Sequence, residues 1–429
     1  MTLMNFSMAR PSSRSTPRAG RGGHRGRLRC GALLTVAVGV LAACGGGQTS
    51  SLGTSARPAT ADSDLRTATV HTVPGMPRVV NPNNQYSQAG RGKFSPATKG
   101  ALDRVYVPNL KSDDVDVIDP KTLKVIGRFP VGVDPQHVVP SYDLKTLWVA
   151  NEDVNGTNGS VTPINPKTGL PGPSIPVDDP YNLYFTPDGR SVIVVAETLK
   201  RLDFRDPHTF ALQASLPLPQ CAGVNHGDFS IDGSYLILSC EFQRGIIKVD
   251  WRTHQVVGAL TLAPDSIPQD VRDSPNGKTF YVADLLHDGG GVWTVDGTTL
   301  TPTGFIPTAL GAHGFVVSRN GKELYIANRG SSTQAIGPAH GPGSVSVLNF
   351  ATNKIVATWD IPGGGSPDMG DITPDGGELW LSGRFDNVVY VFDTTSGAEV
   401  TIPVDEEPHG VAVWPQPGRY SLGHTGIMR

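Results

Sequence analysis

The feature that most constrains the fold is a repeat of about 44 residues that occupies most of the chain. Most copies carry a tight turn of the Asp-Gly or Asn-Gly type, where glycine supplies the positive φ that such turns require. The residues that open the turns are Ser141, Thr186, Ser230, Ser274, Ser318, Thr373 and, in a degenerate copy, Trp414. Their spacings are 45, 44, 44, 44, 55 and 41 residues, and an insertion at 330–343 accounts for the longest. A fixed period of this length predicts a repeat architecture rather than several unrelated domains.

Each repeat has the pattern of four short strands. An apolar segment follows the turn, as at 147–150 and 324–327, a further strand comes next, as at 344–348, and the last is short, as at 125–129. Four strands in about 40–45 residues are typical of a β-propeller blade. The 51 glycines and 36 prolines also exclude a helical bundle, because helix interiors tolerate neither residue well. The predicted class is therefore all-β.

The two ends of the repeat region complement each other. The segment 104–109 has the pattern of a second strand but has no turn before it, and the missing inner strand occurs at 408–414. We therefore expect the C-terminal strand to complete the first blade. This closure gives a seven-bladed β-propeller with four-stranded blades over residues 101–416, and it removes the exposed sheet edges that a linear stack would carry.

Several segments resemble the YVTN-type repeats of bacterial β-propellers. They are PHGVAV at 408–413, LYIAN at 324–328, SVSV at 344–347 and the Pro-Asp-Gly turns. The resemblance covers about residues 100–415 and implies an extracytoplasmic seven-bladed propeller. Function varies widely among proteins with this repeat, so the resemblance predicts the fold and not the activity.

The first 43 residues have the features of an export signal. Seven arginines precede a 13-residue apolar run at 31–43, which is too short for a membrane-spanning helix. The segment LAACG at 41–45 resembles the lipobox of bacterial lipoproteins, which implies cleavage before Cys44 and attachment of lipid to its sulfur. An ordinary signal peptide with an incidental cysteine is the alternative. We expect residues 44–65 to form a flexible tether and residues 66–100 to form a strap along the domain.

These features predict a protein on the extracytoplasmic side of the cell membrane, held there by a lipid anchor. Loss of the first 43 residues changes the net charge from −3 to −10, because that segment holds seven arginines and no Asp, Glu or Lys. An acidic protein without a basic aromatic patch makes a poor nucleic-acid binder. The expected partners are therefore the membrane, through the anchor, and a cell-envelope protein or small ligand; no nucleic acid is expected, and we expect a monomer.

Residues at the start of each inner strand converge on the axis of a propeller. Counting back four and five residues from each turn gives two such positions per blade. Histidine occupies four of the blades, and Asp or Met occurs in two others. The candidate metal ligands are His137, His226, His313, His409, Asp270 and Met369. Imidazole, thioether and carboxylate together suit copper, zinc or iron better than magnesium, so the sequence predicts a transition-metal site with copper favoured.

A second interpretation of the same histidines is structural. In YVTN-type repeats the Pro-His-Gly segment is common, and its imidazole can form a hydrogen bond between neighbouring blades. His313 and His409 fit that pattern, whereas His137 and His226 lie one position later. Adjacent positions of a strand also face opposite sides of its sheet, so the two columns need not reach one cavity. The sequence leaves both interpretations open.

Two further features bear on the site. Residues 417–429 form either a surface tail, which we favour, or a segment that folds over one end of the channel and brings His424 to the site. Cys221 and Cys240 flank one predicted hairpin, and in an exported protein this arrangement predicts a disulfide. A thiolate pair that helps His226 bind a metal is the alternative.

Three functions remain open on the sequence alone. The first is a lipid-anchored module that binds a ligand or protein at the cell envelope, and it needs only the fold and the anchor. The second is oxidation of a small substrate at a copper ion in the channel. The third is a cation-dependent lactonase or lyase, in which Asp270, Asn182 and His226 would hold the cation. The chain has no HExxH, CxxC, GxSxG or P-loop motif that would favour another enzyme class.

Overall fold

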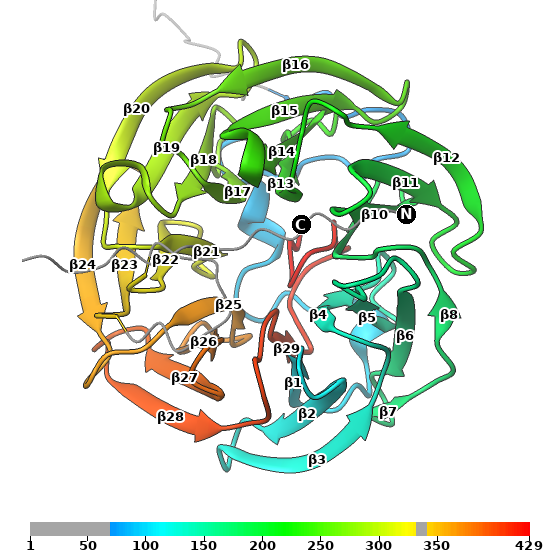
Figure 1. Cartoon of the computed structure of the whole chain (residues 1–429), viewed down its shortest axis with the longest axis vertical. Helices are drawn as coiled ribbons and strands as arrows, with labels where there is room; N and C mark the ends of the chain where they lie inside the picture. The colour runs from blue at the N-terminus through cyan, green and yellow to red at the C-terminus, as the bar shows by residue number, and fades with distance from the viewer. Residues whose placement is uncertain (1–68, 332–340) are drawn as a thin grey trace, which may run out of the picture. The chain divides into compact units, whose positions relative to one another are not determined.

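Seven antiparallel sheets surround a central axis in the computed structural model, which describes residues 69–331 and 341–429 (Figure 1). Each sheet is one blade, and the blades follow one another in chain order around the ring. The predicted all-β seven-bladed propeller is therefore confirmed. The export signal, Cys44 and the tether lie outside the described residues. Within the described part of the chain, no helix has the length and apolar character needed to cross a membrane.

The strands occupy four positions from the axis outward. The inner strands of blades 1 to 7 are β29 (Ala412–Trp414), β4 (Pro135–Pro140), β9 (Asn182–Phe185), β13 (Val224–Phe229), β17 (Pro268–Asp273), β21 (Ala312–Val317) and β25 (Pro367–Ile372). The second strands are β1 (Arg104–Asn109), β5 (Leu147–Asn151), β10 (Val192–Ala196), β14 (Leu236–Cys240), β18 (Thr279–Asp284), β22 (Glu323–Asn328) and β26 (Glu378–Gly383).

The outer half of each blade is made in the same order. The third strands are β2 (Asp114–Asp119), β6 (Ser160–Asn165), β11 (Arg201–Arg205), β15 (Gly245–Asp250), β19 (Gly291–Asp296), β23 (Ser344–Asn349) and β27 (Val388–Asp393). The outer strands are β3 (Lys124–Pro130), the pair β7 (Leu170–Pro171) and β8 (Ile175–Pro176), β12 (Leu212–Pro217), β16 (Gln255–Thr261), β20 (Thr301–Pro307), β24 (Lys354–Asp360) and β28 (Glu399–Pro403).

Burial along the blades explains the sequence patterns. Inner strands such as β4 and β13 are buried at every residue, because both of their faces meet other parts of the ring. Outer strands such as β16 and β24 alternate between exposed and half-buried residues, since one face meets solvent. In blade 2 the outer strand is split into β7 and β8, and proline is found at such edge positions because it cannot donate to a ladder.

The ring closes where the sequence predicts. Strand β29 pairs antiparallel with β1, and Trp414 lies opposite Arg104. The first blade therefore combines one strand from the C-terminal side of the repeat region with three from its N-terminal side. Apolar clusters fill the spaces between neighbouring blades; one of them joins Tyr106 of β1, Val149 of β5 and Trp414 of β29.

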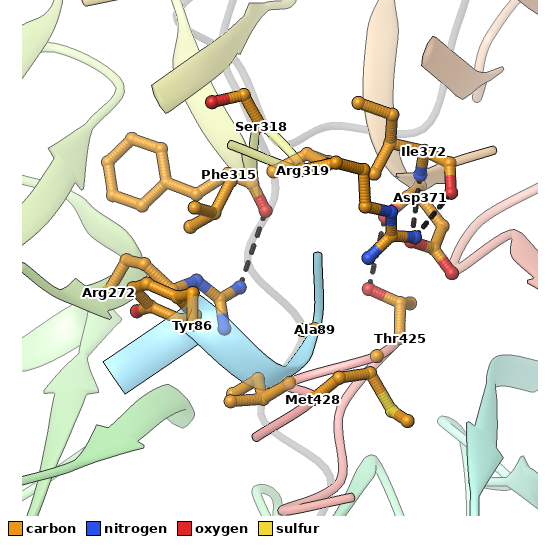
Figure 2. A pocket seen from close by; sticks show the side chains of 15 residues that line it. Tyr86, Ala89, Arg272, Phe315, Ser318, Arg319, Asp371, Ile372, Thr425 and Met428 are labelled. Atoms are coloured by element: carbon orange, nitrogen blue, oxygen red, sulfur yellow. Dashed lines mark hydrogen bonds and ion pairs between the residues drawn. The ribbon is translucent and has the colours of Figure 1, made fainter. Parts of the chain in front are cut away.

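The N-terminal strap and the tail both lie at one end of the channel. We call this end the base; it is where the inner strands lead into their tight turns, and the opposite end is the mouth. The strap contains the short 3-10 helices η1 (Gln85–Gln88) and η2 (Pro96–Thr98), and its Tyr86 donates a hydrogen bond to the backbone oxygen of Asp273 at the end of β17. Figure 2 shows the tail residues Thr425 and Met428 close to Tyr86 and Ala89 of the strap.

The tail is not a surface segment, so our favoured expectation for residues 417–429 is wrong. Its Tyr420, Leu422, Ile427 and Met428 are 1–3% exposed, and the first three belong to the apolar cluster between blades 3 and 4. The Arg429 side chain donates to the buried Asp228 carboxylate at 2.9 Å. Burial of these four apolar side chains favours a tail that covers the base over one that remains in water.

The disulfide is confirmed. Cys221 and Cys240 are bonded, and they join the start of the first hairpin of blade 4 to the end of strand β14. The alternative, in which two thiolates help His226 to bind a metal, is therefore excluded, because neither sulfur is a free thiolate.

Candidate metal centre

Bulges at the start of the inner strands bring both predicted columns of residues to the channel. In five blades the pairing between the inner and second strands shifts register there. The shifts fall at Pro135/His137, Val224/Gly227, Pro268/Val271, Ala312/Phe315 and Pro367/Gly370. A bulge places an extra residue on one strand, so strict alternation fails locally. His137 and His409 come from different columns, yet their ring centroids are 4.6 Å apart.

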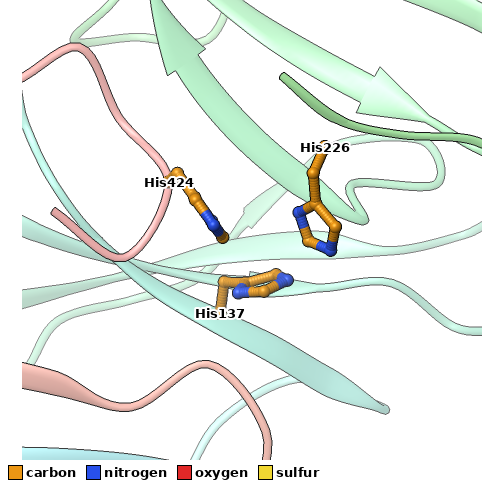
Figure 3. A group of neighbouring side chains, drawn as sticks. All are labelled: His137, His226 and His424. Atoms are coloured by element: carbon orange, nitrogen blue, oxygen red, sulfur yellow. The ribbon is translucent and has the colours of Figure 1, made fainter. Parts of the chain in front are cut away.

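Within residues 69–331 and 341–429, three histidines bring metal-ligating nitrogens close together. His137 comes from β4, His226 from β13 and His424 from the tail, and they face one another in Figure 3. One nitrogen of each lies within 4.8 Å of one nitrogen of the other two. All three are fully buried. We call these residues the histidine cluster; two of them were predicted as ligands, and the third was named only through the less favoured placement of the tail.

Asn182 fixes the tautomers of two of these histidines. Its Oδ1 accepts from the backbone N–H of Leu183 at 2.8 Å, so its Nδ2 carries the two N–H groups that face His226 and His424. These groups donate to Nδ1 of His226 at 3.2 Å and to Nδ1 of His424 at 3.0 Å. Each ring therefore carries its proton on Nε2.

The two Nε2–H groups have acceptors of their own. Nε2 of His226 donates to the hydroxyl oxygen of Tyr181 at 2.9 Å, and Nε2 of His424 donates to Oδ2 of Asp270 at 3.4 Å. A carboxylate behind an imidazole fixes the ring and makes its other nitrogen a better ligand. Asp270 thus holds His424 in place rather than pointing at a shared centre itself.

His137 has no such partners. Neither of its ring nitrogens has a hydrogen-bond partner among the described residues, although the ring is fully buried. Buried polar atoms are almost always paired, so an unpaired imidazole beside two others is the strongest local indication of a missing ligand. Burial, reinforced by His409 and His424, lowers the pKa of His137 well below its usual value. Burial and His424 do the same for the pKa of His226, so both rings are neutral, as metal binding requires.

His313 and His409 belong to a separate network of charges. His313 Nδ1 lies 2.6 Å from Oδ1 of Asp368 in the next blade, and His409 Nδ1 donates to the backbone oxygen of Gln136 at 3.1 Å, also across a blade boundary. Asp368 in turn accepts from Arg329 at 2.8 Å. Although burial opposes ionisation, Arg329 and His313 hold the pKa of Asp368 well below its usual value. These contacts agree with the structural interpretation of the two histidines.

The two remaining predicted ligands have different surroundings. Arg272 and the backbone N–H of Phe315 both donate to Oδ2 of Asp270. Burial opposes ionisation here too, but Arg272 and His424 hold the pKa of Asp270 below its usual value. Met369 is buried, and its sulfur packs against Gly314 of the neighbouring blade. Asp270 is therefore an orienting group, and Met369 contributes to packing between blades.

The histidine cluster fits a transition-metal ion after a small closure. Ligand nitrogens about 2.0–2.1 Å from a tetrahedral ion lie roughly 3.4 Å apart, which is up to about 1.4 Å closer than the 4.8 Å limit of the spacings here. His137 has no hydrogen bonds to lose when it rotates inward. Asn182 Nδ2 now donates to the lone pair of Nδ1 in His226 and in His424. An ion bound to these two nitrogens would displace the amide from both.

The mouth holds a cavity of about 360 Å³ above this cluster. Tyr181 links the cavity to the cluster, because it lines the cavity and its hydroxyl oxygen accepts a hydrogen bond from His226. Charged residues at the ends of the second strands complete the lining, and our sequence analysis did not identify them. The sequence does carry a signal for them. In five blades the charged residue comes 16 residues after the first of the two channel positions counted back from the turn; these residues are Glu152, Glu197, Glu241, Arg329 and Arg384.

Comparison with known proteins agrees with the fold. A family model described as YNCE-like beta-propeller matches residues 65–417. The chain is 23% identical over 265 residues to a 6-phosphogluconolactonase of Serratia proteamaculans (strain 568), an alignment that covers 57% of this chain and 77% of that protein.

Two solved structures have similar folds. Hydrazine synthase of Kuenenia stuttgartiensis has a TM-score of 0.55 and 19% identity, with 69% of this chain and 94% of that chain covered. A putative 6-phosphogluconolactonase from Bacteroides uniformis ATCC 8492 has a TM-score of 0.54 and 18% identity, with 72% and 99% covered. At these identities the structures share the fold and nothing finer.

Proposed function

The chain belongs to the YNCE-like β-propeller family, and from that premise we propose that this member binds one transition-metal ion at the histidine cluster inside its channel. The observation that carries the proposal is the fully buried His137, whose two ring nitrogens lack partners beside His226 and His424. Imidazole ligands suit copper and zinc, and Cu²⁺ binds most tightly among the divalent ions of this series, so copper is the proposed occupant.

The chain's own residues have distinct roles in this proposal. The three imidazoles are the ligands, Asp270 keeps His424 in its tautomer, and Tyr181 does so for His226. The tail supplies one ligand and covers the base, so the ion also fastens the tail to the ring. We place this protein at the cell envelope, held by lipid on Cys44, where it acts as a binding module.

Metal analysis of protein purified without a histidine tag tests this proposal. After loading with Cu²⁺ and removal of excess ion, we expect about one copper per chain. His137→Ala should weaken copper binding by about 100-fold or more, because loss of a residue that only hydrogen-bonds to a metal ligand already lowers metal affinity by about 10–100-fold. His208→Ala is the matched control, because His208 is exposed in the turn between β11 and β12 at the outer side of blade 3.

Competition against a chelator of known affinity provides the measurement, and circular dichroism shows whether each variant is folded. Copper that stays substoichiometric after loading would contradict the proposal. So would a folded His137→Ala variant that binds as tightly as the unaltered protein.

A second candidate function is hydrolysis of a lactone. Two relatives carry the name 6-phosphogluconolactonase. The residues predicted for a cation-dependent lactonase lie around His424; they are Asp270, Asn182 and His226. Asn182 donates to His226 and to His424, and Asp270 accepts from His424. In this candidate a metal ion supplies an electrophile for the lactone carbonyl, and the mouth cavity admits the sugar.

The assay is hydrolysis of 6-phosphogluconolactone and of δ-gluconolactone by the copper- and zinc-loaded protein. We expect acceleration over the spontaneous rate that EDTA removes and that His137→Ala lacks. Spontaneous rates with every loaded form would exclude the lactonase while leaving metal binding intact. Acceleration that resists chelation would contradict the cation-dependent mechanism.

A further inference from the structure

The mouth of the channel has opposite charges on its two sides. Glu152, Glu197 and Glu241 follow the second strands of blades 2, 3 and 4, and all three line the cavity. Arg329 and Arg384 take the same place in blades 6 and 7. We call the three carboxylates the glutamate arc.

The arginines already have counter-ions. Arg329 donates to Asp368 at 2.8 Å, and Arg384 donates to Glu407 at 3.0 Å. The glutamate arc has none: across the described residues, no lysine or arginine forms an ion pair with any of its three members. Lys111, which also lines the cavity, pairs with Asp134 instead. A ligand would therefore find carboxyl groups without counter-ions on one side of the mouth only.

Two buried amide oxygens lie beside the glutamate arc without partners. Gln136 donates through Nε2 to Glu152, and Asn225 donates through Nδ2 to Glu241 at 2.9 Å. Their other amide atoms, Oε1 of Gln136 and Oδ1 of Asn225, accept no hydrogen bond among the described residues. Both side chains line the cavity, and they are 3% and 2% exposed. Unpaired buried amide oxygens next to carboxyl groups that have no counter-ion call for a donor from outside the chain.

The size and lining of the cavity favour an organic donor over a bare ion. A volume of about 360 Å³ is within the range that accommodates small organic ligands. Tyr181 and Phe242 also line it, and aromatic rings attract organic cations through their faces. Phe242 lies at the rim of the cavity and is 62% exposed, so the fold itself buries little of its ring.

We propose that the mouth binds a small organic molecule that carries a protonated amine, with the amine held among Glu152, Glu197 and Glu241. The three N–H groups of the ammonium find their acceptors among these carboxylates and the free oxygens of Gln136 and Asn225, while the carbon chain lies against Tyr181 and Phe242. The proposal does not depend on a metal ion at the histidine cluster.

The electrostatics of the mouth agree with this assignment. Burial and the neighbouring Asp179 raise the pKa of Glu152 to about 8. Burial and Glu241 raise the pKa of Glu197 well above its usual value, and burial also raises the pKa of Glu241. The arc is thus costly to ionise without a cation, and a bound ammonium relieves that cost.

Calorimetric titration with 1,4-diaminobutane tests the proposal, with 1,4-butanediol as the neutral analogue of the same length. We expect saturable binding of the diamine and none of the diol. Glu197→Gln removes one charge at nearly constant shape and should weaken diamine binding by about 10-fold or more, as expected for a hydrogen bond to a charged group. Glu399→Gln, on the outer strand of blade 7, is the matched control and should change nothing.

Three outcomes would overturn the proposal. They are equal binding of diol and diamine, diamine binding that Glu197→Gln leaves intact, and binding of CaCl₂ in place of the diamine, which would make the arc a metal site. The His137→Ala variant separates the two proposals: it should lose copper and still bind the diamine with unchanged affinity.

Discussion

Deletion of residues 418–429 is expected to lower the free energy of unfolding by about 5 kcal/mol or more and to abolish copper binding. Four apolar side chains of this tail are almost fully buried, and each contributes roughly 1.5–3 kcal/mol before the cost of ordering the segment. The deletion also leaves Asp228 without the Arg429 cation, and it removes His424 from the cluster. Thermal unfolding and copper titration of the same preparation measure both effects.

His424→Ala in the full chain is the control for this deletion. It keeps the apolar contacts of the tail, so we expect most of the stability to remain while copper affinity falls as it does for His137→Ala. A shortened chain that unfolds at the temperature of the full-length protein would show that the tail does not stabilise the ring, and the assignment of His424 as a ligand would then lose its support.

Replacement of Asp368 by Asn is expected to destabilise the protein by about 3–5 kcal/mol. Asp368 is fully buried and accepts three hydrogen bonds from Arg329, at 2.8, 2.9 and 3.1 Å. His313 lies 2.6 Å and Arg384 3.9 Å from its carboxylate. Asn keeps the volume but not the charge, so two buried guanidinium groups share a weaker acceptor. Removal of one partner of a buried ion pair typically costs this much, because the other charge stays buried.

Asp250→Asn provides the comparison for Asp368→Asn. Asp250 pairs with Arg252 at 3.3 Å on the surface of a hairpin, where such pairs contribute about 1 kcal/mol or less. Chemical denaturation of both variants gives the difference in unfolding free energy. Equal losses for the two variants would mean that the Asp368 network does not stabilise the channel.

The repeat explains why the fold could be predicted from the sequence. A turn every 44 residues, followed by apolar segments of strand length, defines blades without any tertiary information. The closure could be predicted because the strand at 104–109 lacks an inner neighbour that the segment 408–414 supplies. Periodic information of this kind also placed His137 and His226 in the channel.

Two parts of the site have no periodic signal in the sequence: His424 and the bulges of the inner strands. His424 lies outside the repeat, and tertiary contacts bring it to the axis: Tyr420, Leu422 and Ile427 pack between blades, and the His424 backbone N–H donates to the Leu183 oxygen at 2.8 Å. The bulges that turn both columns toward the channel follow from backbone geometry, which strand alternation does not predict. The glutamate arc and the two arginines of the mouth differ, because they follow the repeat with an offset of 16 residues from the first channel position of their blades. Counting forward from those positions would have found them.

The pairing of β29 with β1 also sets an order of assembly. A chain synthesised from its N-terminus carries β1 with an unpaired edge until a strand about 300 residues later arrives. That edge is open to intermolecular pairing throughout this interval, so folding of the ring competes with aggregation. His424 follows β29 in the chain, so the histidine cluster can form only after the strand that closes the ring has been synthesised. The cluster is therefore absent from any nascent chain that has not yet reached the tail.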